Sequence, residues 1–151
     1  MPKTSYIIGV SSYYHDSSAC LFKDNKLVYA CEEEKFTGVK HDSTFPRKSI
    51  EYILKNFNVK LEDIEMICYY EDPKIKLDRV KESSKKHTLR NPIYSIKSLY
   101  KFFKNRSELK KEVKKLGSDI FYSKHHDSHL YYSTFSSPFK RGISLSIDGV
   151  G

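Results

Sequence analysis

The first 32 residues contain three short runs that are rich in apolar residues and are separated by polar turns. These runs cover residues 5–12, 17–22 and 27–32. The first run is almost continuously apolar, which is typical of a central strand buried on both faces. The turn 23–26 reads Lys-Asp-Asn-Lys, and Asp and Asn tolerate the left-handed backbone of a tight hairpin. The chain is therefore predicted to begin with an antiparallel meander of three strands, so its fold must contain a sheet.

Helical and extended patterns alternate after this meander. Residues 32–45 are polar and predict a loop with a short helical turn. A helix is expected over 46–58, because Pro46 suits a first helical position and the apolar residues that follow recur at helical spacing. Further elements are expected as strands over 65–70, 119–123 and 142–148, and as helices over 94–104, 107–116 and 125–135. We predict one α/β domain, in which a mixed sheet carries helices on its faces.

The positive charge of the chain is concentrated in one segment. The formal net charge is +8, and residues 74–115 contain 15 lysines and arginines against 4 acidic residues. We expect 71–117 to form a basic helical insertion between strands, in which 74–92 lack clear periodicity. Ser107 is expected to cap a helix at its N-terminus, and Gly117 is expected to end that helix.

Two interpretations of this basic segment stay open. It fits a surface that binds a polyanion, and it also fits a solvated helical face. Lysine outnumbers arginine twelve to three between residues 74 and 115. Because bidentate recognition of phosphate favours arginine, nucleic acid is not an expected partner.

The cysteines indicate a reducing compartment. Cys20, Cys31 and Cys68 form no Cys-x-x-Cys motif and are too few and too scattered for a disulfide framework. We expect reduced thiols in a cytoplasmic protein. The N-terminus lacks the apolar stretch of a secretory signal, and no segment approaches the ~20 apolar residues that a membrane span needs. A membrane is therefore not an expected partner.

Histidine provides the most specific chemical signal. Residues 125–129 read His-His-Asp-Ser-His. On a helix His125 and His129 lie on one face and could bind the same metal ion, whereas His126 points roughly 100° away. Asp148 could supply a hard oxygen ligand, and a set of two histidines and one carboxylate suits Fe(II), Mn(II) or Zn(II). The alternative is a pair of capped or surface histidines.

Two further segments are candidates for binding and proton transfer. Asp148 precedes a glycine-rich turn with Gly149 and Gly151, whose backbone N–H groups could approach a phosphate closely. Residues 11–18 form a hydroxyl-rich loop around His15, which could act as a general base near neutral pH. The alternative for His15 is a local pair with Asp16.

The segment 32–42 is the third candidate. Three consecutive glutamates, 32–34, leave a strand, and they are expected to be solvated or bound to cations. Lys35, Lys40 and His41 could instead recognise a phosphate.

These motifs occur together, and in their order along the chain they resemble the start of an O-carbamoyltransferase of the NodU/CmcH type. The matching segments are residues 8–19, 32–37, 40–42, 125–129, 137–139 and 148–151. The resemblance implies an actin-like ATPase (ribonuclease H-like) half domain and kinship with the tRNA threonylcarbamoyl transferases. It covers nearly the whole chain except the basic segment.

The resemblance also implies an activity. Such enzymes make carbamoyl adenylate from carbamoyl phosphate and ATP, and then transfer the carbamoyl group to a hydroxyl of a sugar-like or natural-product acceptor in a biosynthetic step. His15 would lie near the transferred group, and Ser11 and Ser12, with Asp148, Gly149 and Gly151, would bind the nucleotide. His125, His129 and Asp148 would hold the metal, usually iron.

The chain departs from this family in three respects. Lys35 and Gly38 replace the two arginines of the usual Glu-Arg-Phe-Thr-Arg motif, which weakens phosphate recognition there, and Leu130 and Tyr131 replace small residues. Family members are several times longer, so we expect residues 1–151 to lack the second half domain and the YrdC-like domain. The remainder of the enzyme is then an expected partner, in cis or in trans.

Two hypotheses about activity follow from these departures. The first is an N-terminal portion of an O-carbamoyltransferase that does not turn over alone. The second is a non-catalytic binding or scaffold module, with 74–115 as its polyanion-binding segment. Self-association into a homodimer stays open in both.

Overall fold

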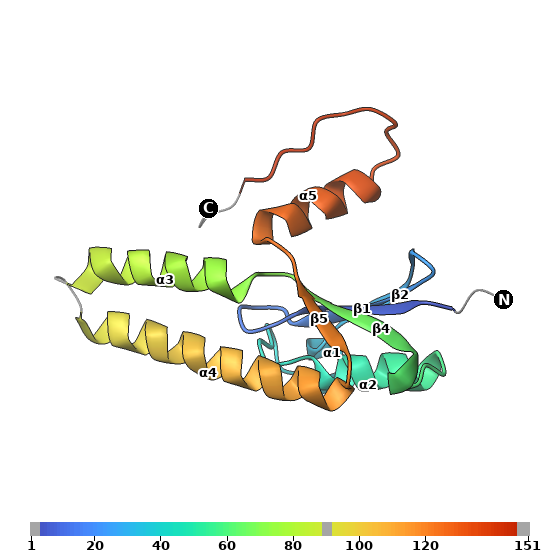
Figure 1. The fold of residues 1–151 in the computed structure, drawn as a ribbon, viewed down its shortest axis with the longest axis horizontal. Coiled ribbons are helices and arrows are strands. Elements are labelled where there is room, and N and C mark those ends of the chain that lie inside the picture. Colours follow the sequence, from blue (N-terminus) through green and yellow to red (C-terminus); the bar gives the residue numbers. More distant parts are fainter. Residues whose placement is uncertain (1–3, 89–91, 148–151) are drawn as a thin grey trace.

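The computed structural model describes residues 4–88 and 92–147. Its elements are, in chain order, β1 (Tyr6–Ser11), β2 (Ser18–Lys23), β3 (Lys26–Glu32), α1 (Glu34–Thr37), α2 (Arg47–Asn56), the 3₁₀ turn η1 (Leu61–Asp63), β4 (Ile64–Tyr69), α3 (Pro73–Thr88), α4 (Pro92–Leu116), β5 (Asp119–Tyr122) and α5 (His125–Phe135). Figure 1 shows α2 and α4 on one side of the sheet and α5 on the other. The predicted α/β class is confirmed.

The five strands form one mixed sheet in the order β3-β2-β1-β4-β5. β2 pairs antiparallel with both β1 and β3, so the predicted meander is confirmed, and β1 is the central strand. Asp24 and Asn25 in the hairpin turn have φ angles of 48° and 64°, the left-handed values that their side chains tolerate. β4 runs parallel to β1, and β5 runs parallel to β4.

The core lies between the sheet and the two helices α2 and α4. Alternate residues of the strands, such as Ile8 and Ile67, are fully buried on this face. Ile53 of α2 packs against them, as do Leu109 and Val113 near the end of α4. Burying an aliphatic side chain of this size contributes about 1.5–3 kcal/mol, so these contacts fix where both helices lie.

The basic segment is a helical hairpin. Residues 74–92 lack clear periodicity in the sequence, yet they are helical as far as Thr88, because α3 occupies 73–88. Its start has a local cause: the carboxylate of Asp72 accepts a hydrogen bond of 2.7 Å from the backbone N–H of Lys74, and Pro73 takes the first helical position. The Asp-Pro pair was the sequence signal for this helix.

The two helices predicted over 94–104 and 107–116 are one helix, α4. Ser107 lies inside it, so the predicted N-cap is wrong: Leu109 and Val113 are buried, and their packing holds the helix together through this polar stretch. Gly117 ends the helix with a φ of 69°, as predicted. Residues 89–91 lie outside the described residues.

The predicted final strand is wrong over residues 142–147, which have no regular structure. The alternating pattern is present, yet Ile143, Leu145 and Ile147 are 100%, 77% and 85% exposed. Alternation predicts a strand only where a neighbouring strand supplies hydrogen bonds, and no described strand lies beside this segment. The predicted order therefore has one strand too many, and Asp148 lies outside the described residues.

The other expectations agree with the structure. The helix predicted over 46–58 appears as α2, the strands over 65–70 and 119–123 as β4 and β5, and the helix over 125–135 as α5. The three cysteines are free thiols. Within the described parts of the chain, no helix has both the length and the apolar character that crossing a bilayer requires.

An ion pair joins the start of α2 to α4. Arg47 donates from Nε and Nη2 to the two carboxylate oxygens of Glu112, at 2.7 and 2.9 Å. Glu112 is buried, and these bonds hold its pKa at about 2, below the ordinary value of 4.5. Because the pKa is lowered in the folded state, the stabilisation is complete above pH 4.5 and is lost as the pH falls toward 2.

We predict that Arg47→Leu lowers the free energy of unfolding at pH 7 by roughly 1.5–3 kcal/mol, the usual range for charged hydrogen bonds. Urea unfolding should show this loss shrinking between pH 4.5 and pH 2. Lys60→Leu is the control, because Lys60 forms an exposed pair with Glu62 at 3.4 Å. An equal loss in both variants, or a loss independent of pH, would contradict the prediction.

Candidate functional site

The candidate site lies at one edge of the sheet. Because β1, β4 and β5 are parallel, their carboxyl ends meet at the same edge. The loop with His15 follows β1, and α5 with His125 and His129 follows β5. Open α/β sheets bind ligands outside the carboxyl ends of their strands, so the topology brings the predicted chemical residues to the expected edge.

Two loops pack together at this edge. The backbone N–H of Tyr13 donates to the carbonyl of Ser43 at 2.8 Å, and that of Ser17 donates to the carbonyl of Asp42 at 2.7 Å. The carboxylate of Asp42 is buried and accepts hydrogen bonds from Thr44 and Thr37 at 2.8–2.9 Å. The N–H of Thr44 is the main cause that lowers the pKa of Asp42. The loop 38–46 is therefore tied both to itself and to the His15 loop.

Glu33 connects these loops to α2. Its carboxylate is buried and accepts hydrogen bonds from the backbone N–H groups of Lys48 and Ser49 at 3.0 and 2.8 Å, and from the Ser49 hydroxyl at 2.7 Å. Its own N–H donates to the carbonyl of Ser17 at 2.8 Å. The expectation of solvated or cation-bound glutamates is therefore wrong for Glu33, which caps the N-terminus of α2 from a distant part of the chain.

A sequence signal for this cap existed. α2 has Pro46 at its N-cap position, which has no side-chain hydrogen bond to offer. A helix that lacks a local cap needs another acceptor for its first N–H groups when its end is buried. The preceding row of three glutamates contained that acceptor.

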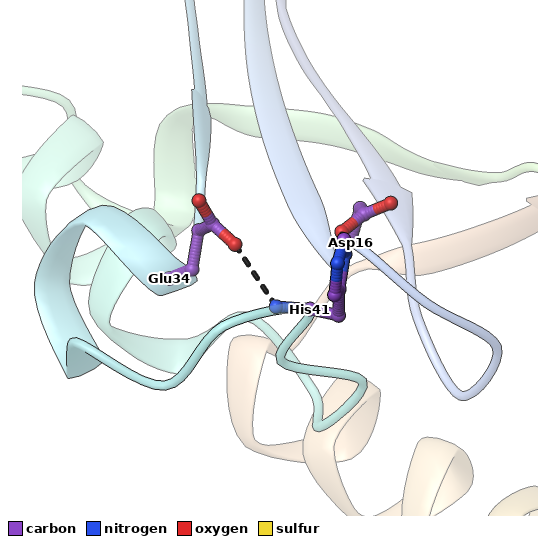
Figure 2. Close-up of side chains that lie close together, drawn as sticks. All are labelled: Asp16, Glu34 and His41. Atoms are coloured by element: carbon purple, nitrogen blue, oxygen red, sulfur yellow. Dashed lines mark hydrogen bonds and ion pairs between the residues drawn. The ribbon is translucent and has the colours of Figure 1, made fainter.

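His15 and His41 face each other across Asp16. Asp16 receives a contact of 2.7 Å from Nδ1 of His15 and one of 2.8 Å from Nδ1 of His41, each on a different carboxylate oxygen. The local pair left open in the sequence analysis is therefore present. Glu34 accepts a hydrogen bond of 3.0 Å from the backbone N–H of His41 (Figure 2). Lys35 lies 3.3 Å from Glu34 and thus contacts a carboxylate.

The electrostatics of this cluster follow from its hydrogen bonds. The bond from His41, and then that from His15, holds the pKa of Asp16 below its ordinary value. The same contact raises the pKa of His41. Among the described residues, Asp16, Glu34 and His41 also offer one ligand atom each within 4.8 Å of one another, a set that could hold a metal ion.

The hydroxyls assigned to nucleotide binding differ in exposure. Ser11 is the half-buried last residue of β1, whereas Ser12 is buried and donates to the phenolic oxygen of Tyr69 at 3.4 Å. Tyr69 donates in turn to the carbonyl of Ser12 at 3.0 Å, and burial raises the pKa of this tyrosine to about 12. The Ser12 residue is therefore hydrogen-bonded to Tyr69 at the end of β1.

The predicted metal histidines converge. Nε2 of His125 and Nε2 of His129 are 3.4 Å apart on one face of α5. Two nitrogens at this separation can both lie about 2.1 Å from one ion. The hydroxyl of Ser128 donates to the carbonyl of Tyr70 at 3.0 Å, which fixes this face of α5 beside the end of β4. Asp148, Gly149 and Gly151 lie outside the described residues.

One buried cluster was missed by the sequence analysis. Glu71, two residues after the end of β4, is buried and forms ion pairs with Lys76, at 2.6 Å, and with Arg79. Burial lowers the pKa of Lys76. An adjacent cavity of about 30 Å³ is lined in part by Tyr13, whose hydroxyl has no hydrogen-bond partner among the described residues. This volume has room for a water molecule and is too small for a substrate.

Comparison with known proteins identifies the family. Residues 6–151 match the family described as Carbamoyltransferase N-terminus. The chain is 33% identical over 97% of its length to "Uncharacterized protein sll1178" of Synechocystis sp.. It is 32% identical over 93% to "Nodulation protein NolNO" of Sinorhizobium fredii, and 27% identical over 91% to "Uncharacterized protein MJ1051" of Methanocaldococcus jannaschii. The chain belongs to the carbamoyltransferase N-terminus family, which confirms the resemblance found in the sequence.

The relatives are much longer than the chain. The aligned region covers 26% of the Synechocystis protein, 20% of the Sinorhizobium protein and 21% of the Methanocaldococcus protein. Residues 1–151 thus span between a fifth and about a quarter of the relatives that they match.

We predict that Glu33→Gln lowers the free energy of unfolding by about 1–3 kcal/mol. The amide keeps one acceptor oxygen, so its NH2 group is placed against the N–H of either Lys48 or Ser49, which leaves a buried donor without an acceptor. Urea unfolding measures the loss, and amide hydrogen exchange at residues 48 and 49 should become faster. Glu32→Gln is the matched control, because Glu32 is half-exposed and pairs only with Lys35, at 3.5 Å, among the described residues. Equal losses in both variants would contradict the cap.

Proposed function

We propose that the chain is part of an O-carbamoyltransferase. It takes carbamoyl adenylate, made from carbamoyl phosphate and ATP, and transfers the carbamoyl group to a hydroxyl of a sugar-like or natural-product acceptor. The family match over residues 6–151 is the observation that carries this proposal. The finer fold assignment, an actin-like (ribonuclease H-like) half domain, is supported by the antiparallel meander followed by parallel strands that are joined through helices.

His15 is the proposed general base. Its ring is exposed on a loop at the carboxyl edge of the sheet, and Asp16 engages its Nδ1. Nε2 at the far side of the ring is then the atom that takes the proton from the acceptor hydroxyl as that oxygen attacks the carbamoyl carbon. The same ring, once protonated, stabilises the developing negative charge.

His125 and His129 are the proposed metal ligands, with Asp148 as the third. Their converging Nε2 atoms fit a divalent ion, and imidazole suits iron and zinc alike. A bound ion would polarise the phosphate side of the mixed anhydride. The contribution of this chain is to hold the two imidazoles on one face of α5, which Ser128 fixes against Tyr70.

The proposed setting follows from the expected partners. The remaining half domain and the YrdC-like domain, in cis or in trans, complete the nucleotide site in the cytoplasm. A homodimer is compatible with this arrangement.

Transfer is tested with carbamoyl phosphate, ATP and a panel of sugar hydroxyl acceptors, and product is measured by mass spectrometry. We expect product from the longest polypeptide that the gene encodes and none from residues 1–151 alone. His15→Gln should reduce the rate by about 10²–10⁴-fold, the usual contribution of a general base. An undiminished rate in this variant would remove His15 from the chemistry. The absence of product from every form of the protein would contradict the proposed function.

Metal binding is tested on residues 1–151 directly. After loading with Fe(II) under reducing conditions, elemental analysis should find metal in proportion to protein. The double variant His125→Ala/His129→Ala should lose this metal, whereas His126→Ala, on the same helix but off the shared face, should keep it. Wild-type protein that holds no metal after loading would contradict a preformed site.

A second candidate function is a non-catalytic module that binds a polyanion through 74–115. The observation in its favour is the exposure of lysines along α4, which include Lys97, Lys101, Lys104 and Lys111. Salt-dependent retention on heparin by a protein that yields no carbamoylated product would favour this candidate over transfer.

A further inference from the structure

Asp16 lies between two imidazole rings. Its Oδ2 is 2.7 Å from Nδ1 of His15, and its Oδ1 is 2.8 Å from Nδ1 of His41. The two histidines come from different loops, and His41 lies 25 residues beyond Asp16 in the sequence. One carboxylate therefore uses both of its oxygens to hold two rings that the sequence does not place together.

The chemistry of this contact fixes the protons. An ionised carboxylate only accepts hydrogen bonds, so Nδ1 donates in both rings. In a neutral His15 the proton therefore lies on Nδ1, and Nε2 carries the free lone pair. Tyr14, whose ring centroid is 4.4 Å from that of His15, packs beside the ring and limits its rotation.

The backbone around the contact is built to hold this geometry. Asp16 and His41 have φ angles of 48° and 55°, in the left-handed region. Aspartate tolerates this region, whereas at His41 the conformation is less favourable and is held by the surroundings. Glu34 holds it by accepting the N–H of His41 at 3.0 Å, and the bond from Ser17 to Asp42 joins the two loops beside the contact.

The charges of the cluster balance without a metal ion. The charged groups that face His41 are Asp16 and Glu34, and Glu34 is also paired with Lys35. With His41 protonated, the two carboxylates of Asp16 and Glu34 face two positive charges, those of His41 and Lys35.

We propose that Asp16 is a positioning residue that keeps Nε2 of His15 free to act as the base, and that His41 holds the Asp16 carboxylate in place through its other oxygen. The inference deepens the proposed function and rests on it for the role of His15. The tautomer itself is a property of the folded chain and can be measured without turnover.

The test uses residues 1–151 labelled with ¹⁵N at histidine and observed by long-range ¹H–¹⁵N NMR. Wild-type His15 should be mainly the Nδ1–H tautomer. Asp16→Asn, which keeps a residue that tolerates the left-handed backbone, should shift His15 mainly to Nε2–H and should lower the pKa of His41. His41→Gln should leave the His15 tautomer unchanged, as should the control Asp78→Asn at an exposed aspartate that lies 4.0 Å from Lys81.

Two results would overturn the inference. A wild-type His15 that is mainly Nε2–H does so by itself, even if the Asp16 variant fails to fold. Stoichiometric binding of Zn²⁺ at His41 of the wild-type protein would also overturn it, because these residues would then form a metal site.

The pH dependence gives a second readout. Because Asp16 raises the pKa of His41, their pair stabilises the fold fully below the ordinary histidine pKa of 6.5 and is lost as the pH rises through the raised value. The difference in unfolding free energy between wild type and Asp16→Asn should therefore shrink as the solution becomes alkaline. A difference that is the same at pH 6 and at high pH would contradict the pairing.

Turnover separates this inference from the proposed function. In a polypeptide that carries out transfer, Asp16→Asn should lower kcat by roughly 10- to 100-fold, part of a general base's contribution, and leave KM for carbamoyl phosphate unchanged. An unchanged kcat together with an altered tautomer would overturn the positioning role alone. No transfer by any form, with the tautomer as expected, would overturn the proposed function and leave the geometry of Asp16 in place.

Discussion

The buried carboxylate of Glu33 is the interaction on which the candidate site depends. It accepts three hydrogen bonds at the N-terminus of α2, while its N–H binds Ser17 and its carbonyl accepts from Thr37. A carboxylate without these partners would be too costly to bury. The end of β3, the start of α2 and the His15 loop are therefore positioned together by one side chain, and none of the three can shift without leaving a buried polar group unpaired.

The loop geometry follows from this anchor. Once Ser17 and Glu33 are fixed, Asp42 and Ser43 can meet the backbone of the His15 loop, and His41 comes within reach of Asp16. The left-handed conformations of Asp16 and His41 are local costs that these contacts outweigh. The contact between two exposed histidines and a carboxylate is thus a consequence of buried hydrogen bonds beneath it.

The sequence predicted those elements whose cause is local. Asp24 and Asn25 determine their own turn, and the histidines of α5 recur at a helical period, so the hairpin and α5 were predicted correctly. Asp72 and Pro73 were also local, and the start of α3 could have been predicted from them. The cap of α2 by Glu33 could not be predicted from the sequence. It joins Glu33 to Lys48 and Ser49, which lie 15 and 16 positions further along the chain and come close only through the fold.

The error over residues 142–147 arose because a local pattern predicted a strand that has no neighbouring strand to pair with among the described residues. Alternation of Ile143, Leu145 and Ile147 records which side chains share a face, but pairing decides whether a strand forms. At the candidate site, likewise, residue spacing predicts which side chains lie close together but does not predict every hydrogen-bond partner. The spacing of His125 and His129 was sufficient to predict that their rings converge, whereas the partner of His15 was left open between a free base and a local pair.

The end of β4 links the two halves of the site. Tyr69 binds the carbonyl of Ser12 at 3.0 Å through its hydroxyl, and its own carbonyl accepts from Ser123 at 2.9 Å. The carbonyl of Tyr70 accepts from Ser128, and its ring centroid lies 5.7 Å from that of His125. These two tyrosines therefore hold the His15 loop on one side and the face of α5 that carries His125 and His129 on the other. In the proposed mechanism the base His15 and one ion held by His125 and His129 act on the same anhydride and need a fixed relative position. The strand β4, which lies between β1 and β5, provides it.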